Sequence, residues 1–247
     1  MRVPGPTSPP NVGSAIRAAS LVLSSAIAGC GGGGGTPRVV GLDSSTAPNS
    51  GVRCVDGVPL QDGVTQFPNL TFAFGGAGSC TIVTFSQQDP GTGAPGTVTA
   101  AQIRVGPVTG PMRFVRLRNF FQNKPGSNGN PQCCGIQEYG AIFTPTPGSV
   151  TAVTLNFRMT WERVPPANDF TTIIAQDRIG LEVLDANTPI PAVWTRNGLP
   201  EIGVNGTFIW LPSISAQGFP AGTLQLPNYA TSFSGFVPTF NYTFVPG

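Results

Sequence analysis

Apolar and polar residues alternate without interruption from Val153 to Trp161, and this run limits the possible folds more than any other feature of the chain. Its apolar members are Val153, Leu155, Phe157, Met159 and Trp161. A period of two residues predicts a β-strand with one buried face and one face in solvent. A sheet of such strands needs a second apolar layer over its buried face, so the pattern favours a β-sandwich.

Strands of the same kind are predicted along most of the remaining chain. The last of them alternates in the same way, and its apolar face is made of Phe240, Tyr242 and Phe244. Apolar runs between turn residues predict further strands at Leu70–Phe74, Thr81–Phe85, Val98–Val105, Arg113–Phe121, Thr171–Ala175, Ile179–Leu184 and Thr207–Leu211. With 33 glycines and 26 prolines, the chain has little room for long helices. The predicted fold is all-β: an antiparallel β-sandwich, jelly-roll-like or immunoglobulin-like.

The charge of the chain is low and nearly balanced. Charged residues make up 10% of it, far below the roughly 25% that is typical of soluble proteins. The net charge of +2 comes from Arg2 and Arg17, which precede every acidic residue. Without these two arginines, eleven basic residues face eleven acidic ones. This balance offers no electrostatic basis for binding nucleic acid.

The segment before Cys30 has the three regions of a secretory signal peptide. Basic residues precede a short apolar stretch from Ala18 to Gly29, which ends in small residues. At twelve residues, this stretch is shorter than the roughly 20 needed to span a bilayer. The sequence Ile27-Ala28-Gly29-Cys30 resembles the lipobox of bacterial lipoproteins, in which an aliphatic residue and two small residues precede the lipidated cysteine.

The resemblance covers about the first 35 residues and implies export, followed by cleavage before Cys30. A diacylglycerol on the Cys30 sulfur and a further acyl chain such as palmitate on the new amino terminus would then anchor the protein to a membrane. Gly31 stands where lipoproteins retained on an inner membrane often carry aspartate, so the resemblance implies the outer membrane in a host with two membranes. The alternatives are an ordinary cleaved signal with an incidental Cys30, and a buried helix of a cytosolic protein.

Composition divides the chain into three parts. Residues 1–29 form the predicted signal peptide, residues 30–50 the lipidated cysteine with a flexible linker, and residues 51–247 the β-sandwich domain. The linker starts with a run of five glycines and stays rich in small and polar residues. Turn-rich breaks at Gln87–Gly96 and Asn123–Gln132 could instead separate two immunoglobulin-like domains. We favour one domain because both breaks also fit ordinary long loops.

The chain contains no histidine, which removes the most common general base and the most common metal ligand. Ser-His-Asp and Cys-His catalysis are thereby excluded, as are zinc sites that contain histidine. No glycine-rich stretch lies between a strand and a helix, as a phosphate-binding loop requires. The sequence therefore predicts no cofactor.

Carboxylate chemistry stays open, because four acidic residues lie within seventeen positions: Asp169, Asp177, Glu182 and Asp185. Two facing carboxyl groups could hydrolyse a glycosidic bond. Asp169, Asp177 and Asp185 could bind Ca²⁺ through loop oxygens, although the spacing is not that of a calcium-binding loop. We favour the interpretation that these acidic residues lie in solvated turns.

Two other features suggest a ligand. Trp194 lies where an apolar run meets a turn, and an exposed tryptophan there could stack on a sugar. Trp161 and Trp210 instead continue apolar faces, so we expect them in the core. Arg116 and Arg118 share one strand face and could bind an anionic glycan or lipid headgroup. The more common role of such arginines is to lie in solvent and discourage edge pairing.

Four cysteines follow Cys30 in the sequence: Cys54, Cys80, Cys133 and Cys134. An even number of cysteines in an exported chain predicts disulfides. Neighbouring side chains on extended backbone point to opposite sides, so we favour separate bonds from Cys133 and Cys134 to Cys54 and Cys80. The alternative pairs Cys54 with Cys80 and leaves a bond between the two adjacent cysteines.

Together these features predict a cell-envelope lipoprotein whose sandwich is a non-catalytic binding or structural module. Its expected partners are the membrane, through the lipid, and a glycan or another envelope protein. The alternative is a carboxylate-based hydrolase of envelope or extracellular polysaccharide. Two carboxyl groups facing each other across an open cleft would favour the hydrolase, whereas scattered carboxylates would favour the module.

Overall fold

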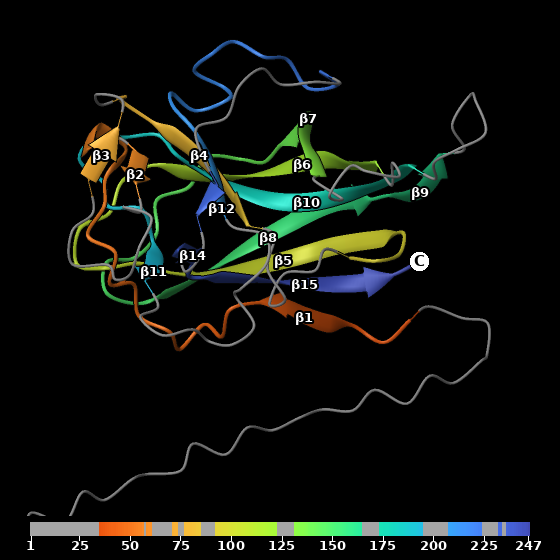
Figure 1. Cartoon of the computed structure of the whole chain (residues 1–247). Helices are drawn as coiled ribbons and strands as arrows, with labels where there is room; N and C mark the ends of the chain where they lie inside the picture. The colour runs from red at the N-terminus through yellow and green to blue at the C-terminus, as the bar shows by residue number, and fades with distance from the viewer. Residues whose placement is uncertain are drawn as a thin grey trace, which may run out of the picture. The chain divides into compact units, whose positions relative to one another are not determined.

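The computed structural model describes residues 35–56, 58–60, 71–73, 77–84, 92–122, 131–164, 173–194, 207–223, 232–233 and 236–247. Their regular structure is β-strand, apart from one turn of 3₁₀-helix at Cys54–Asp56, and no α-helix occurs in these ranges. Two antiparallel sheets pack as a sandwich (Figure 1). The predicted all-β sandwich is therefore confirmed.

The smaller sheet has four strands in the order β1-β15-β5-β8. Their bounds are β1 (Arg38–Gly41), β15 (Phe240–Pro246), β5 (Gly96–Arg104) and β8 (Val150–Met159). In β8 the alternating run buries Leu155, Phe157 and Met159 and exposes the residues between them. The period of two residues thus places one face of the strand in the core, as the sequence predicts.

The larger sheet has seven strands: β13-β12-β4-β10-β6-β7 in order, with β9 paired to β10 beside that path. Their bounds are β13 (Ser232–Phe233), β12 (Thr207–Trp210), β4 (Cys80–Thr84), β10 (Ile173–Val183), β6 (Met112–Gln122), β7 (Pro131–Tyr139) and β9 (Trp161–Val164). Two short pairs lie apart from both large sheets: β2 (Val58–Leu60) with β3 (Thr71–Ala73), and β11 (Ala192–Trp194) with β14 (Phe236–Pro238).

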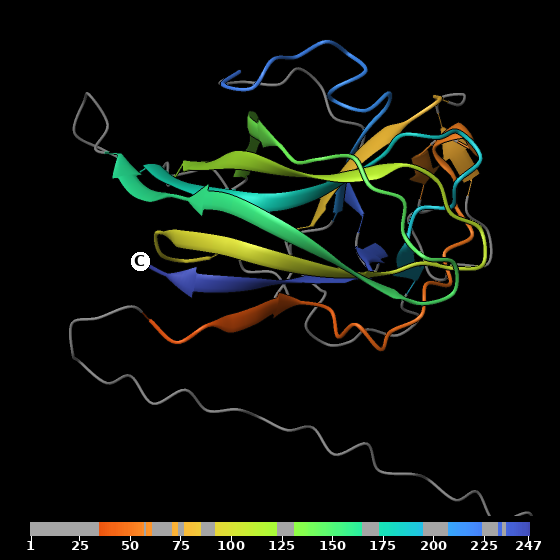
Figure 2. The same cartoon turned by 180° about the vertical axis from the view of Figure 1, so that it is seen from behind.

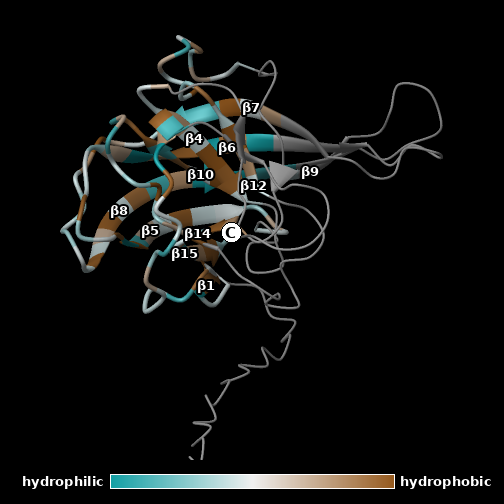
Figure 3. Ribbon diagram, turned by 60° about the vertical axis from the view of Figure 1, so that its left-hand side comes forward, coloured by the Kyte–Doolittle hydropathy of each residue, from teal (hydrophilic) through white to brown (hydrophobic). Residues whose placement is uncertain are grey.

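The main core lies between the two large sheets. Both sheets contribute large side chains to it, among them Ile82, Phe114, Phe157, Leu181, Tyr242 and Phe244. Burying each such side chain stabilises the fold by about 1.5–3 kcal/mol. Hydropathy follows this arrangement, since apolar residues dominate β4, β10 and β12 (Figure 3).

A second apolar cluster lies on the opposite face of the larger sheet. Its buried residues are Val83, Val115, Leu117, Cys134, Ile136, Phe208, Trp210 and Ile214. Residues 211–223, which we call the cover segment, pack against this face. Within it, the backbone N–H of Gly222 donates to the carbonyl of Ile136 at 2.9 Å. The larger sheet is therefore buried on both faces.

The chain changes sheets at Thr160. The sequence predicts one strand through Trp161, but β8 ends at Met159 and Trp161 begins β9 in the larger sheet. Trp161 is accordingly half-buried, whereas Trp210 is fully buried, as expected. A change of sheet breaks the strand without breaking its alternating pattern, so the sequence gives no sign of it.

At two other places the structure differs from the elements expected from the sequence. The strands predicted at Thr171–Ala175 and Ile179–Leu184 form one strand, β10, which runs straight through Asp177. The region predicted as linker contains β1, which pairs with β15 in register. In both places polar residues are held in a sheet by partners far away in the sequence.

The strands define two ends of the sandwich (Figure 2). We call one of them the tether end because Gly35, the first described residue, lies there. Gly35 packs so closely on Pro246 that an added Cβ would lie 2.6 Å from the proline Cβ. β1 begins here, and β15 and β8 end here. The far end carries the loops 105–111 and 140–149, which precede β6 and β8.

Candidate functional site

The first charged cluster surrounds Asp177, whose side chain is fully buried. Asp177 lies on the same face of β10 as the core residue Ile179, so its carboxylate points between the sheets. Arg116 Nη1 donates to Oδ2 at 2.8 Å, and Arg118 Nε donates to Oδ1 at 3.0 Å. Both arginines come from β6, which pairs with β10 so that Arg118 lies opposite Asp177.

Asp177 also holds the point where the chain changes sheets. The backbone N–H of Thr160 donates to Asp177 Oδ2 at 2.7 Å, and the Thr160 hydroxyl donates to the same oxygen at 3.1 Å. The Asp177 N–H in turn donates to the Thr160 carbonyl at 3.1 Å. Arg118 Nη2 donates to the Thr160 hydroxyl. The carboxylate thus joins β6, β10 and the β8–β9 junction.

A fourth charged residue lies at the edge of this cluster. Glu138 on β7 is opposite Arg116 in register, and its Oε2 is 3.4 Å from Arg116 Nε. The Glu138 side chain is 43% exposed, and Nε forms no hydrogen bond in the described part of the chain. This contact is therefore a weak ion pair, since solvent screens it.

The second charged cluster surrounds Glu182, which lies on the other face of β10 under the cover segment. Arg113 Nε donates to Oε2 at 2.6 Å, and Thr81 Oγ1 donates to Oε1 at 2.8 Å. Ser215 of the cover segment donates twice, from its backbone N–H to Oε1 at 3.0 Å and from its hydroxyl to Oε2 at 2.7 Å. Each carboxylate oxygen therefore accepts two hydrogen bonds, which satisfies a fully buried anion.

Tyr139 completes the second cluster. The Arg113 guanidinium lies over the Tyr139 ring, 4.3 Å from its centre, and the Tyr139 hydroxyl donates to the carbonyl of Phe219 at 2.7 Å. Burial, together with the negative charge of Glu182, raises the pKa of Tyr139 to about 12, although Arg113 opposes this. The phenol therefore stays protonated at neutral pH and ties the cover segment to β7.

The two buried carboxylates cannot act on one substrate together. Asp177 and Glu182 lie on opposite faces of the same strand, and arginines and hydroxyl groups occupy the oxygens of both. A glycosidase needs two carboxyl groups about 5–10 Å apart on either side of a sugar. This arrangement therefore does not support paired-carboxylate hydrolysis at β10.

The structure corrects our interpretation of these acidic residues as solvated. Asp177 and Glu182 are both 0% exposed and lie within a strand, because cross-strand arginines compensate their charge. Asp185 does lie in a turn, where it accepts a 2.6 Å hydrogen bond from the N–H of Asn187. Asp169 lies outside the described residues. In the described ranges, no three His, Cys, Asp or Glu residues form a group that could hold a metal ion.

The predicted ligand-binding residues have different outcomes. Arg116 and Arg118 share a face with the core residue Phe114, and only 15% and 20% of their side chains are exposed. They bind Asp177 between the sheets, so the expectation of a solvated strand face is wrong. Trp194 belongs to β11, where its backbone lies opposite Phe236, but its side chain lies outside the described residues.

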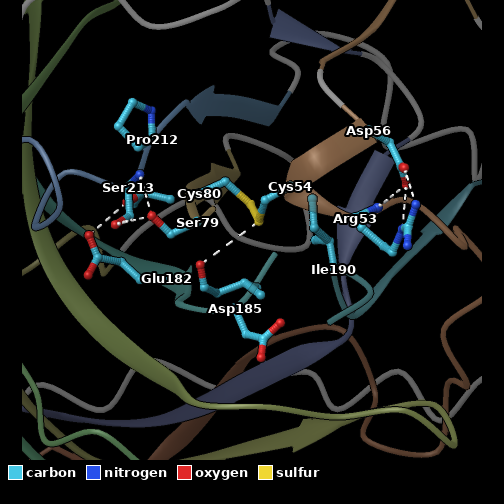
Figure 4. Close-up of a disulfide and its surroundings, with 12 residues drawn as sticks. Arg53, Cys54, Asp56, Ser79, Cys80, Glu182, Asp185, Ile190, Pro212 and Ser213 are labelled. Carbon is cyan, nitrogen blue, oxygen red and sulfur yellow. Dashed lines mark hydrogen bonds and ion pairs between the residues drawn. A yellow bond between two sulfur atoms is a disulfide. The ribbon is translucent and has the colours of Figure 1, made fainter. Parts of the chain in front are cut away.

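The structure also corrects the favoured disulfide pairing. Cys54 is bonded to Cys80, with the two Cα atoms 5.4 Å apart (Figure 4). Both sulfurs lie in the main core between the sheets, whereas Cys134 lies in the cluster on the outer face of the larger sheet. The sheet therefore separates Cys134 from Cys54 and Cys80. Cys134 is itself disulfide-bonded, and the Cys133 side chain lies outside the described residues.

Sequence reasoning missed an uncharged apolar surface at the far end. Val108, Ile142 and Val150 are 53%, 61% and 38% exposed, and they account for three of the four large exposed hydrophobic residues in the described part of the chain. Their loops lie side by side, since Gly148 N–H donates to the Gly106 carbonyl at 2.8 Å. The sequence does carry one sign of this surface, since residues 105–112 and 139–150 contain no charged residue.

No known protein family, curated protein or solved structure matches this chain significantly. Within the described ranges, no helix is long and apolar enough to cross a membrane.

Proposed function

We propose that this protein is a lipid-anchored module of the cell envelope that binds a partner without catalysis. The observation that carries the non-catalytic part is the neutralisation of both buried carboxylates. Asp177 holds the β8–β9 junction, and Glu182 holds the cover segment. Each carboxylate is paired with arginine. Their positions on opposite faces of β10 favour a structural role for both over the hydrolase alternative.

The support for the anchor is the sequence Ile27-Ala28-Gly29-Cys30, which resembles a lipobox. An exported chain with a lipid on Cys30 would display its sandwich at a membrane surface. The Cys54–Cys80 disulfide agrees with an oxidising compartment outside the cytoplasm.

The surface best suited to a partner is the far end. Exposed apolar residues on neighbouring loops that themselves carry no charged residue are typical of contact surfaces. Val108 and Ile142 are more than half exposed, and two prolines in each of their loops restrict the backbone. Such a surface can bind without losing much conformational entropy.

Two measurements test the proposal on the full-length protein expressed in a bacterial host. Intact mass of the membrane fraction should show cleavage before Cys30 and added acyl chains, and Cys30→Ala should prevent both. A glycan array and a cross-linking experiment in cells should then detect binding that weakens in Val108→Ser/Ile142→Ser. Hydrolysis of an envelope polysaccharide that disappears in Asp177→Asn would instead support the alternative.

A further inference from the structure

The chain between the predicted lipid and the sandwich is short, and this limits how the protein can stand on a membrane. This inference rests on the proposed lipid at Cys30. Five residue steps separate Cys30 from Gly35, which packs on Pro246 at the tether end. A fully extended chain covers at most about 3.6 Å per residue, so these steps span no more than about 18 Å. A lipid on Cys30 therefore holds the tether end close to the bilayer surface.

The sandwich is longer than this connection. β5 runs from the tether end to the far end over nine residues, which corresponds to about 30 Å. Two orientations are therefore possible. If the sandwich stands upright, the far end points away from the membrane, and if the molecule lies on its side, both ends lie near the membrane. Charge at the two ends decides between these orientations.

The tether end exposes two arginines that form no ion pair with any side chain in the described part of the chain. Arg38 begins β1, where its guanidinium lies 5.1 Å from the centre of the Phe244 ring and donates to the carbonyl of Thr92. Arg158 is exposed near the end of β8, opposite Thr97 in register. Among the described residues, neither arginine contacts a carboxylate. The two arginines lie on the two edge strands of the smaller sheet, Arg38 on its core-facing side and Arg158 on its solvent-facing side, so both edges of the tether end carry positive charge.

The far end carries the opposite sign. Its described acidic residues are Asp43, Asp56 and Asp185, and its described basic residues are Arg53 and Arg104. Arg53 is paired with Asp56 at 2.6 Å. Asp43 accepts a hydrogen bond from the N–H of Ser45 in its own turn, which lowers the pKa of its carboxyl and keeps it charged. An anionic surface would therefore attract the tether end and repel the far end.

We propose that the tether end docks on anionic phospholipid headgroups through Arg38 and Arg158, so that the sandwich stands upright and loops 105–111 and 140–149 point away from the membrane. Basic residues near an anionic leaflet strengthen attachment, and each is expected to change the docking equilibrium about fivefold. The lipid supplies attachment, and the arginines supply orientation. The far-end surface is then the part of the protein that a partner can reach.

Hydroxyl-radical footprinting of the full-length lipidated protein in vesicles tests this orientation. We compare vesicles of phosphatidylcholine with vesicles that also contain phosphatidylglycerol. Residues at the tether end, the exposed Val39 and the partly exposed Pro246 among them, should be protected more in the anionic vesicles, while Val108 and Ile142 should react equally in both. Because exposed charges are screened by salt, 0.5 M NaCl should remove the difference.

Arg158→Gln is the cleanest variant, since its side chain is exposed and its loss leaves no buried group without a partner. It should lower the ratio of tether-end protection in anionic vesicles to that in phosphatidylcholine vesicles about fivefold. Arg158→Glu should lower this ratio further. The matched control is Arg104→Gln at the far end, which should leave protection unchanged. Flotation with vesicles should be the same for all variants, because the lipid anchors each of them.

The outcomes separate this inference from the proposed function. A cysteine without lipid in the intact mass would refute the anchor and, with it, this docking. A lipidated protein protected equally in both vesicle types, or protected first at Val108 and Ile142, would refute the docking alone.

Discussion

Strand β10 carries two buried carboxylates five residues apart, and they stabilise different parts of the molecule. Asp177 points between the sheets and binds Arg116, Arg118 and Thr160, so it connects the larger sheet to the end of β8. Glu182 points to the outer face and binds Arg113 together with Ser215 of the cover segment. The same ion-pair chemistry thus joins two sheets at one position and fastens a surface segment at the other.

The comparison shows why burial alone does not reveal function. A buried carboxylate with perturbing neighbours is often the sign of a catalytic group. Here both carboxylates are fully satisfied by donors from neighbouring strands. Replacing such pairs with apolar side chains can be neutral for stability, whereas removing one partner leaves an uncompensated buried charge. The two clusters should therefore respond strongly, and differently, to single substitutions.

Asp177→Ala should have the largest effect. It leaves Arg116 and Arg118 without their carboxylate between the sheets and removes the acceptor for the Thr160 N–H. We expect the free energy of unfolding to fall by about 3–5 kcal/mol. Urea denaturation followed by tryptophan fluorescence measures this change. The control is Asp185→Ala, which removes only a turn hydrogen bond, and equal losses for both variants would contradict a junction role for Asp177.

Glu182→Ala should cost less, about 2–3 kcal/mol, because one arginine loses its partner and Arg113 can still lie over Tyr139. The loss should be local. Hydrogen exchange should rise in residues 213–223 while the region around Thr160 stays protected. If exchange rises equally around Thr160, the two clusters are not independent.

Ser215→Ala tests how much of the Glu182 cluster depends on the cover segment. Only the hydroxyl is lost, since the backbone N–H of Ser215 still donates to Oε1. The expected loss is about 1 kcal/mol. A loss as large as that of Glu182→Ala would mean that the hydroxyl, and not Arg113, supplies most of the stabilisation.

Tyr139→Phe should have the smallest effect at neutral pH, about 0.5 kcal/mol, because it removes one partly exposed hydrogen bond to Phe219. Folding raises the pKa of Tyr139 from 10 to about 12, so the folded state favours the protonated phenol. Its contribution is complete below pH 10 and is lost as the pH rises through 12. Melting temperatures across this range should therefore fall more steeply for the native protein than for Tyr139→Phe. Parallel curves would show that Tyr139 titrates like a free tyrosine.

Some features of the fold follow from residues that are close in the sequence. The alternating run in β8 predicts its buried face, because side chains on a strand alternate between its two sides. The scarcity of long helices follows from frequent proline and glycine, which interrupt helical hydrogen bonding. The missing histidines exclude whole classes of catalysis whatever the fold.

The far-end surface could be predicted from the sequence only in part. Its lack of charge is visible in the sequence around Val108 and Ile142, but uncharged loops are common. Only the adjacency of the two loops, joined by the Gly148–Gly106 hydrogen bond, makes it one surface. The arginine-bearing tether end could not be predicted at all, since Arg38 and Arg158 are 120 positions apart.

By itself, the sequence determined the strand character of the chain, the type of its core residues and the lipobox-like segment that ends at Cys30. The tertiary structure decided which charges are buried and which cysteines meet. Arg116 and Asp177 are 61 residues apart, and only the register of β6 against β10 brings them to 2.8 Å. Cys54 of the 3₁₀ turn and Cys80 of β4 bond because both lie in the main core between the sheets, while Cys134 lies on the outer face of the larger sheet. Periodicity is a property of neighbouring residues, whereas these partnerships depend on sheet pairing and layer order.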